Sequence, residues 1–313
     1  MERGIIDTIK GVARGQFLAG EPLERHCSFR IGGPADLFFV PAGREDFLAS
    51  WKVLGAARVQ SLVIGNGTNV LFGDAGVRGA VLRLKDGFDH LRISDMDEAK
   101  KTVVLEVGAG VPLARLHLFA SKKGFLGTEF TFGIPGTVGG AIFCNAGTRL
   151  GTMSGIASEI EVAGPDGKAR WLGAAGAGFG YRTCRLLPGS AVLGARVGLA
   201  IGGRDVATTD VRELKAYRAK CQPLGRPSAG SVFRNPEGDF AGRLIEASGL
   251  KGLRLGGAEV SPVHANFIVN RGRATAAQVK RLMEIVRAEV ERTQKVRLEP
   301  EIHVLGDFLK EEQ

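Results

Sequence analysis

The chain has 313 residues, of which 44% are apolar and 24% are charged. This composition is typical of a folded protein with two or three domains and excludes an intrinsically disordered chain. Its 42 basic and 33 acidic residues give a net charge of +9, which suits an anionic partner such as a nucleotide or a nucleic acid. The basic residues form no dense run, and only two Tyr and two Trp could stack on bases. We therefore expect no nucleic-acid partner.

The four cysteines are too far apart in the sequence for a metal-binding or CxxC motif, so we expect reduced thiols and no metal site. The N-terminal residues mix charged and apolar side chains and lack the uninterrupted apolar core of a signal peptide. No apolar run approaches the length of about 18 residues that crosses a bilayer. These features predict a cytoplasmic protein with no membrane partner.

Apolar periodicity and chain breakers predict helices and strands in the first half of the chain. Residues 1–20 are expected to form a short amphipathic lead-in. The helix that begins at Pro112 should end at Gly124, because proline suits the first turn and glycine suits the C-terminal cap. The other expected elements are strands at 37–40, 61–64 and 102–110 and a helix at 45–57.

The second half continues this mixture of elements. The sequence Gly-Pro-Asp-Gly at 164–167 predicts a hairpin between two strands, and Thr275 is a candidate N-cap for the most regular helix. The other expected elements are a strand at 191–201, helices at 209–219 and 241–247, and strands at 264–270 and 296–305. A last strand would place Glu299, Glu301 and His303 on one face, although a solvent-facing edge would explain the same alternation.

Two glycine-rich segments are candidates for binding a phosphate group. Residues 65–69, Gly-Asn-Gly-Thr-Asn, follow a predicted strand but match neither the Rossmann nor the Walker motif. Taken alone, they fit a hairpin turn better. Residues 132–147 contain five glycines; amides in such turns can converge on an anion, and the small Thr137 and Ala141 leave room for it. A glycine-rich connection between two strands accounts for this composition equally well.

Seven motifs, in this order, resemble the MurB family of UDP-N-acetylenolpyruvoylglucosamine reductases. They extend from about Arg30 to Gly306 and read RIGGPAD, GNGTNVLF, GIPGTVGGAIFCNAG, GYR, SAGSVFRNP, HANFIVN and LEPEI. The resemblance implies an α+β fold with a two-part FAD-binding domain of the vanillyl-alcohol-oxidase (PCMH) type and a C-terminal α+β substrate-binding domain. The expected boundaries are 1–20 for the lead-in, 21–86 and 87–208 for the FAD-binding subdomains, and 209–313 for the C-terminal domain.

The resemblance also implies an activity. It is the NADPH-dependent reduction of UDP-N-acetylglucosamine enolpyruvate to UDP-N-acetylmuramate through bound FAD, in peptidoglycan precursor synthesis. Residues 65–69 contain no histidine, so the FAD should be noncovalent, and we expect a monomer. Two alternatives stay open at this point: an oxidase of the same flavin fold that acts on another alcohol or sugar, and a nucleotide-binding protein without catalysis.

The family motifs assign roles to individual residues of this chain. Arg182 would stabilise the negative charge that develops on the substrate, Ser231 would donate a proton to carbon, and Glu301 would act when protonated or by orienting a neighbour. The substrate would also contact Tyr181, Arg234, Asn235, His264 and Asn266. FAD would contact Gly65, Asn66, Gly67, Thr68, Asn69, Gly133, Ile134, Pro135, Gly136, Thr137, Gly140 and Ala141.

The chain departs from the family pattern at several positions. Cys184 stands where the family commonly has serine, Arg234 stands where lysine is frequent, and Pro262-Val263 replaces a segment that usually contains lysine. The stretch between Arg182 and Lys220 is also too short for the tyrosine-bearing substrate loop of the longer subclass. These departures concern substrate contacts and favour the shorter subclass, so no Tyr is assigned to the uridine site.

Overall fold

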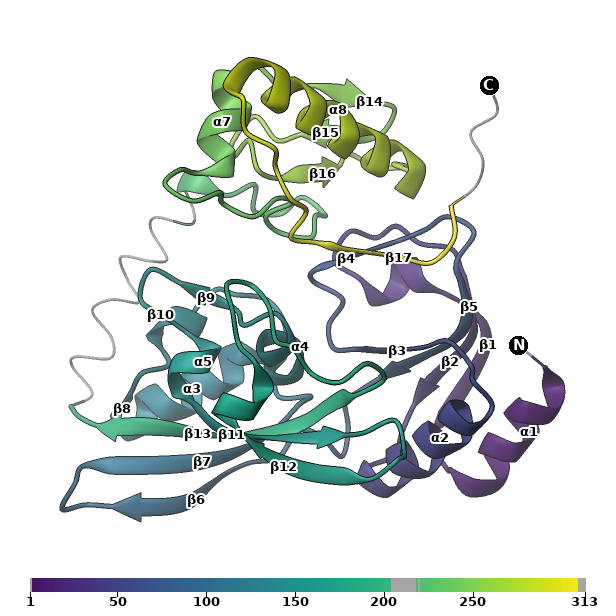
Figure 1. The fold of residues 1–313 in the computed structure, drawn as a ribbon, viewed down its shortest axis with the longest axis vertical. Helices are drawn as coiled ribbons and strands as arrows, with labels where there is room; N and C mark the ends of the chain where they lie inside the picture. Colours follow the sequence, from purple (N-terminus) through teal and green to yellow (C-terminus); the bar gives the residue numbers. More distant parts are fainter. Residues whose placement is uncertain (1, 204–217, 219, 309–313) are drawn as a thin grey trace. The chain divides into compact units, whose positions relative to one another are not determined.

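The computed structural model describes residues 2–203, 218 and 220–308 (Figure 1). They belong to two compact units, each assembled from separate segments of sequence. Unit 1 comprises residues 1–19, 37–65 and 79–216, and unit 2 comprises residues 20–36, 66–78 and 217–313. The contiguous boundaries expected from the motifs stay a prediction. Apart from residue 218, the helix expected at 209–219 lies outside the described residues.

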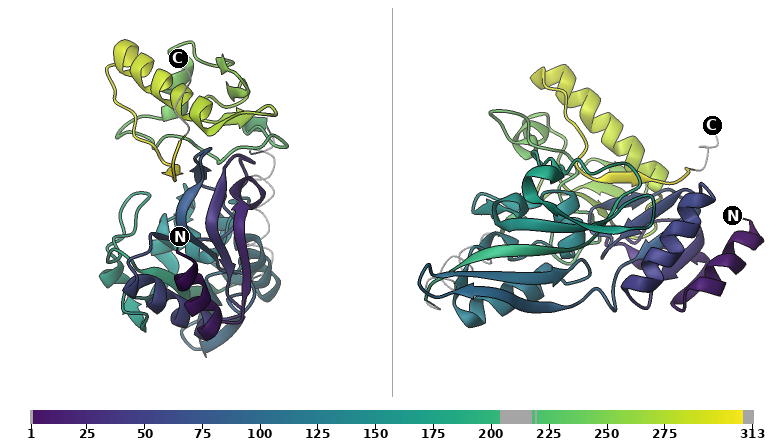
Figure 2. Two further views of the ribbon diagram at one scale, coloured as in Figure 1. Left: turned by 90° about the vertical axis from the view of Figure 1, so that its right-hand side faces the viewer. Right: turned by 60° about the horizontal axis from the view of Figure 1, so that its bottom comes forward.

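A four-stranded sheet has the strand order β1-β2-β5-β3. Its strands are β1 (Gln16–Pro22), β2 (Pro34–Val40), β3 (Ser61–Ile64) and β5 (Val77–Arg83). The lead-in forms helix α1 (Arg3–Val12), which lies beside helix α2 (Arg44–Ala56) (Figure 2). The buried Ile9 of α1 joins Phe47 and Trp51 of α2 in one apolar core. The amphipathic lead-in is therefore part of the core of unit 1.

A second sheet of unit 1 has the order β12-β11-β13-β7-β6, and β8 also pairs with β13. Its strands are β6 (Leu91–Asp97), β7 (Thr102–Gly108), β8 (Phe125–Leu126), β11 (Ala157–Ala163), β12 (Ala169–Gly173) and β13 (Ala191–Ile201). The predicted hairpin at 164–167 is confirmed, because β11 and β12 pair antiparallel. Buried apolar side chains join this sheet to helices α3 (Leu113–Lys123), α4 (Val138–Phe143) and α5 (Met153–Ile156) (Figure 1).

The ends of α3 follow from the residues that flank it. Pro112 occupies the N-cap position, so the helix begins at Leu113, one residue after the predicted start, and Gly124 closes the helix in a left-handed conformation. The remaining short elements are η1 (Leu23–His26), η2 (Glu129–Thr131), η3 (Ala174–Ala177), β9 (Gly147–Thr148) and β10 (Gly151–Thr152).

Unit 2 contains a three-stranded sheet, β14 (Arg254–Leu255), β15 (Ala258–Val260) and β16 (Ile268–Asn270), together with helices α7 (Ala241–Ala247) and α8 (Ala276–Gln294). Thr275 caps α8 in a capping box with Gln278, which confirms the predicted N-cap. The Asp74 carboxylate also accepts hydrogen bonds from the first two amides of α8, at 2.7 and 2.9 Å. Among the described residues, no helix is both long and apolar enough to cross a bilayer.

The hairpin interpretation of residues 65–69 is wrong. The strand before them, β3, runs parallel to β5, whereas the strand after them, β4 (Val70–Phe72), runs parallel to β17 (His303–Leu305). The two flanking strands therefore do not pair with each other. The segment 132–147 does lie between two strands, β8 and β9, as the second alternative expects, and it contains the short helix α4.

The last predicted strand is interrupted. Residues 299 and 301 bond to the segment 232–234, whereas only His303–Leu305 forms a regular strand, with β4 as its partner. Pro300 has no amide hydrogen and lies between these two hydrogen-bonded residues, and the chain then changes its pairing partner. Glu299, Glu301 and His303 therefore do not share one strand face as predicted. The strand expected at 264–270 starts only at Ile268, because the Phe267 amide closes a turn on the His264 carbonyl.

Candidate active site

A buried hydroxyl group marks the first part of the site, within unit 1. Thr137 precedes α4, is 3% exposed, and its Oγ1 has no hydrogen-bond partner. Gly65, at the end of β3, approaches the same oxygen so closely that a Cβ atom there would lie 2.2 Å from it. An unsatisfied buried hydroxyl costs about 1–3 kcal/mol, so a ligand group is the natural partner for this one. The pair fits a phosphate-bearing cofactor that approaches the main chain closely.

The rest of the glycine-rich segment differs from the prediction that its amides converge on an anion. The amides of Val138 and Gly139 donate to the carbonyls of Val111 and Ala109, each at 2.9 Å. These two amides therefore do not converge on an anion. Gly139 is explained by packing, because a Cβ atom there would lie 2.8 Å from the Ala109 Cβ. By contrast, Gly140 is exposed, and the only atom near its Cβ position is Thr137 Oγ1, at 3.9 Å.

The other residues predicted to contact a cofactor vary in exposure. Gly133 and Pro135 are exposed, Ile134 and Gly136 are half-buried, and Ala141 is buried in the core. In unit 2, Asn66 is exposed and Thr68 is half-buried. Gly67 is explained by packing, since a Cβ atom there would lie 2.1 Å from the His26 carbonyl oxygen.

Asn69 contacts the segment that carries Glu301, within unit 2. Its side-chain Nδ2 donates to the Glu301 carbonyl at 3.3 Å, and its own carbonyl accepts from the His303 amide at 3.0 Å. The prediction gave Asn69 a role in cofactor binding alone. The structure adds a second role, because Asn69 fixes the main chain on both sides of Ile302.

Arg182 lies in a tight turn of unit 1. The Gly180 amide donates to the Thr183 carbonyl at 3.0 Å, and the Thr183 amide donates back to the Gly180 carbonyl at 3.3 Å. Arg182 has a φ of +54°, in the left-handed region that disfavours side chains. Such strain costs about 1–3 kcal/mol and collects at functional sites. Tyr181 is 56% exposed and stacks near the guanidinium group, with 5.5 Å between Arg182 Cζ and the ring centroid.

The departure at Cys184 has a structural explanation. Its buried thiol donates to the Ala177 carbonyl, with 3.2 Å between Sγ and oxygen. Burial and, to a smaller extent, the nearby Cys144 raise the pKa of this thiol to about 11. The Cys184 thiol therefore stays protonated at neutral pH and serves as the donor that a serine hydroxyl would also provide.

Asn145, to which the sequence motifs assign no role, contacts the Arg182 turn. Its Nδ2 donates to the Gly180 carbonyl at 2.8 Å. A signal was present, because Asn is common in a left-handed residue after a helix, and Asn145 has a φ of +42° just beyond α4. No sequence pattern indicates which distant carbonyl it binds.

Ser231 and Glu301 are brought close together in unit 2. Ser231 forms an isolated antiparallel bridge with Phe267. The next residue, Val232, accepts a hydrogen bond from the Glu301 amide at 2.7 Å and donates to the Asn266 carbonyl at 2.8 Å. Two predicted catalytic residues that are 70 positions apart in the sequence are thus adjacent along one hydrogen-bonded ladder.

The Asn266 side chain stabilises the main chain next to Val232. It is 3% exposed, and its side-chain amide makes two bonds to the main chain of Phe233, accepting from N at 2.9 Å and donating to O at 2.8 Å. The prediction placed Asn266 in contact with substrate. The structure adds a supporting role, because the side-chain amide holds the main chain of Phe233, and the substrate contact stays a prediction.

Asn235 and His264 are also used partly by the protein. Asn235 is exposed, and its Oδ1 accepts from the Ala241 amide at 3.0 Å, at the start of α7. His264 Nδ1 accepts from the Asn266 amide at 3.2 Å. Burial lowers the pKa of His264, and the Lys251 charge lowers it further. His264 is therefore neutral at pH 7, with its proton on Nε2.

Arg234 contributes a cation to the same unit. Its amide donates to the Glu299 carbonyl at 2.8 Å, whereas its buried side-chain Nε has no hydrogen-bond partner. Burial lowers the pKa of His303, and the charge of Arg234 lowers it further. A neutral imidazole beside a guanidinium group with an unsatisfied donor suits an anionic ligand.

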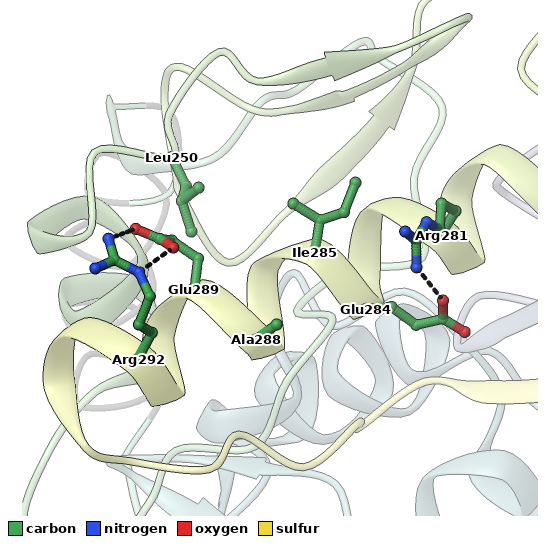
Figure 3. Close-up of a pocket in the computed structure, with 7 residues that line it drawn as sticks. All are labelled: Leu250, Arg281, Glu284, Ile285, Ala288, Glu289 and Arg292. Carbon is green, nitrogen blue, oxygen red and sulfur yellow. Dashed lines mark hydrogen bonds and ion pairs between the residues drawn. The ribbon is translucent and has the colours of Figure 1, made fainter.

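A pocket lined by Leu250 and residues of α8 is a separate feature of unit 2 (Figure 3). Its charged side chains pair with each other, Arg281 with Glu284 at 3.2 Å and Arg292 with Glu289 at 2.7 Å. Leu250 and two α8 residues supply the rest of its lining. None of the predicted site residues lines it, so we do not assign it to the active site.

Two family models match the chain. The FAD binding domain matches residues 35–173, and the C-terminal domain of UDP-N-acetylenolpyruvoylglucosamine reductase matches residues 222–305. Together with the mixed helices and sheets, these matches confirm the predicted fold class, an FAD-binding domain followed by a C-terminal α+β domain. The unsatisfied Thr137 hydroxyl and the close approach of Gly65 fit a bound FAD.

Curated relatives cover nearly the whole chain. UDP-N-acetylenolpyruvoylglucosamine reductase of Anaeromyxobacter dehalogenans (strain 2CP-C) is 46% identical over 98% of this chain and 91% of its own length. The reductase of Halalkalibacterium halodurans is 37% identical over 97% and 99%. The crystal structure of MurB from Thermus caldophilus matches 94% of this chain and 99% of its own, with a TM-score of 0.78 and 36% identity. The chain therefore belongs to the UDP-N-acetylenolpyruvoylglucosamine reductase (MurB) family of FAD-dependent oxidoreductases.

Proposed function

We propose that the chain reduces UDP-N-acetylglucosamine enolpyruvate to UDP-N-acetylmuramate, with NADPH as the hydride donor, in peptidoglycan precursor synthesis. The observation that carries this proposal is the hydrogen bond from the Glu301 amide to the Val232 carbonyl. It places the motif SAGSVFRNP beside the motif LEPEI, and so supports the joint catalytic roles assigned to Ser231 and Glu301. The monomeric state and the cytoplasmic location expected from the sequence stay predictions.

In this proposal, Gly65, Thr137 and Gly140 hold FAD without a covalent bond. Thr137 Oγ1 would donate its hydrogen bond to the cofactor, and the two glycines would let the cofactor approach the main chain. Residues 66–69 and 133–136, with Ala141, keep the cofactor-binding role that the family motifs predict. Asn69 would in addition hold the Glu301 main chain in place.

The bound FAD would supply the hydride that adds to the terminal carbon of the enolpyruvyl double bond. Negative charge then develops on the neighbouring carbon and on the carboxylate attached to it. Arg182 carries a permanent positive charge in a planar fork that matches a carboxylate, so it would stabilise this enolate. Ser231 would donate its hydroxyl proton to the neighbouring carbon, and Glu301 would orient the reacting groups or assist in its protonated form.

The substrate contacts follow from the same assignment. Arg234 would use its unsatisfied Nε donor on an anionic group of the sugar nucleotide. Tyr181, Asn235 and His264 would line the substrate, and the neutral His264 would offer a donor at Nε2. Asn266 would contact the substrate as the family motif predicts, and it would also keep the Ser231–Val232 main chain in place through its own hydrogen bonds.

Replacing Thr137 with valine tests the Thr137 hydroxyl, because valine keeps the shape of the side chain. Valine fills the same volume but lacks the unsatisfied oxygen, so the apoprotein should gain about 1–3 kcal/mol in unfolding free energy. FAD should bind about 10-fold more weakly, because one hydrogen bond is lost. Denaturant unfolding of the apoprotein and fluorescence titration with FAD measure the two effects. Unchanged FAD affinity would show that Oγ1 does not contact the cofactor.

An anaerobic absorbance experiment tests the proposed function directly. The purified protein should show an oxidised-flavin spectrum that NADPH bleaches. Addition of UDP-N-acetylglucosamine enolpyruvate should then restore the flavin colour without oxygen. Bleaching without recovery would reject this substrate, and a protein that takes up no FAD would reject the proposal as a whole.

A further inference from the structure

We infer that Asn145 is a positioning residue that holds the Arg182 turn in its catalytic conformation, an inference that rests on the proposed function. Its Nδ2 donates to the Gly180 carbonyl at 2.8 Å, and its Oδ1 accepts from the Ser154 amide at 3.0 Å. One side-chain amide thus joins two segments that lie far apart in the sequence. The partner of its donor is the first residue of the turn that contains Arg182.

Burial and main-chain hydrogen bonds hold Asn145 in position. It is 6% exposed, and its amide donates to the Ile142 carbonyl of α4 at 3.0 Å. The following amide, of Ala146, returns to the Ala141 carbonyl at 2.7 Å. Asn145 thereby closes the end of the helix that starts after Thr137. It connects the segment proposed to hold FAD with the residue proposed to stabilise the enolate.

The turn depends on such support from outside. Its own closure consists of one bond of 3.0 Å and one of 3.3 Å, and the longer bond ends on the Gly180 carbonyl. The Asn145 bond to this same carbonyl is shorter, at 2.8 Å. Arg182 has a left-handed φ of +54°, and strained backbone of this kind persists only where its surroundings fix it. Loss of the Asn145 bond should let the turn relax and move the guanidinium group.

Two substitutions remove the bond with little disturbance of the backbone. Asn145→Gly tolerates the φ of +42° and deletes both side-chain bonds. Asn145→Asp keeps the acceptor for the Ser154 amide but replaces the donor to Gly180 with a carboxylate oxygen that repels the Gly180 carbonyl. Ser154→Ala is the matched control, because it removes a hydroxyl bonded to Thr152 and leaves the Asn145 contacts intact.

We expect the Asn145 variants to lose activity in only one of the two half-reactions, the re-oxidation of the flavin by substrate. Both Asn145 variants should retain wild-type FAD content and wild-type bleaching by NADPH. Re-oxidation of the reduced flavin by the enolpyruvyl substrate should be at least about 10-fold slower, since a displacement near 1 Å can cost about 10²-fold. Ser154→Ala should match the wild type in all three measurements. Equal slowing of bleaching and re-oxidation would overturn the inference.

A double-mutant cycle shows whether Asn145 acts through Arg182. In the Arg182→Ala background, Asn145→Gly should cause no further loss of the re-oxidation rate, because the group that it positions is absent. Multiplicative losses would assign Asn145 an independent role and overturn the inference. Wild-type protein that the substrate does not re-oxidise would instead refute the proposed function, and the catalytic part of the inference with it.

Hydrogen exchange tests the geometry without any catalysis. The Thr183 amide donates to the carbonyl that Asn145 holds. Its exchange should be at least about 10-fold faster in both Asn145 variants, because local opening of the turn controls exchange. Exchange should be unchanged in Ser154→Ala. Unaltered exchange of the Thr183 amide in Asn145→Gly would show that Asn145 does not hold the turn.

Discussion

Alanine in place of Ser231 is expected to slow re-oxidation of the reduced flavin by UDP-N-acetylglucosamine enolpyruvate by about 10²–10⁴-fold, the usual range for a lost general acid. Bleaching by NADPH should continue at the wild-type rate, because this step needs no proton from Ser231. The ladder from Phe267 through Val232 to Glu301 uses only main-chain atoms at these positions. The fold should therefore survive the substitution. Anaerobic stopped-flow absorbance measures the two half-reactions separately.

Ser228 offers a matched control for this experiment. It lies in the same motif, and the hydrogen bond that it accepts from Ser28 uses its carbonyl rather than its hydroxyl. Ser228→Ala should re-oxidise at the wild-type rate. If Ser231→Ala slowed both half-reactions equally, a folding defect would be the explanation. A wild-type re-oxidation rate in Ser231→Ala would remove Ser231 from the mechanism.

The second large effect is expected from Gly65→Ala. The new Cβ would lie 2.2 Å from Thr137 Oγ1 and 3.1 Å from its Cγ2. Thr137 is 3% exposed, so its short side chain has no space into which it can move. Overpacking of this kind costs about 1–3 kcal/mol. The unfolding free energy should fall by that amount, and the purified protein should contain almost no FAD, because the new methyl group would stand beside the Thr137 hydroxyl where the cofactor is proposed to approach.

Urea unfolding and the flavin absorbance of the purified protein measure these two effects. Gly173→Ala is the control, because it adds a Cβ atom where no other atom lies within 4 Å. Removing the clash in Gly65→Ala with Thr137→Ala should restore stability but not full FAD affinity. If Gly65→Ala retained both its unfolding free energy and its FAD, the proposal that Gly65 and Thr137 hold the cofactor would be refuted.

Several elements could be predicted well from the sequence because their ends carry local signals. The bounds of β13 and α7 agree with the prediction, and α8 begins after the predicted N-cap Thr275. Gly124 caps the end of α3, Gly249 follows the end of α7, and both glycines have a positive φ. Caps and turns of this kind depend on residues a few positions apart, so a single sequence contains the information.

The site was less predictable because its contacts join distant residues. Asn266 binds Phe233 across 33 positions, and Asn145 binds Gly180 across 35. Neither distance leaves a periodic pattern in the sequence. The glycine-rich segment was hard to interpret for a related reason. Gly139 is needed for close packing against Ala109, whereas the sequence suggested an anion-binding turn. The family motifs predict the catalytic residues, and the structure adds the contacts of Asn145 and Asn266 that support these residues.

The pairing of β4 with β17 has a consequence for synthesis of the chain. β4 and Asp74 leave the ribosome long before their partners, β17 and the first turn of α8. Until these partners have been synthesised, the edge of β4 has no strand to pair with, and the Asp74 carboxylate has no helix to cap. Unit 2 therefore cannot be completed from residues 217–313 alone or during early synthesis. Assembly of unit 2 therefore requires that residues 303–305 have been synthesised, about 230 residues after β4.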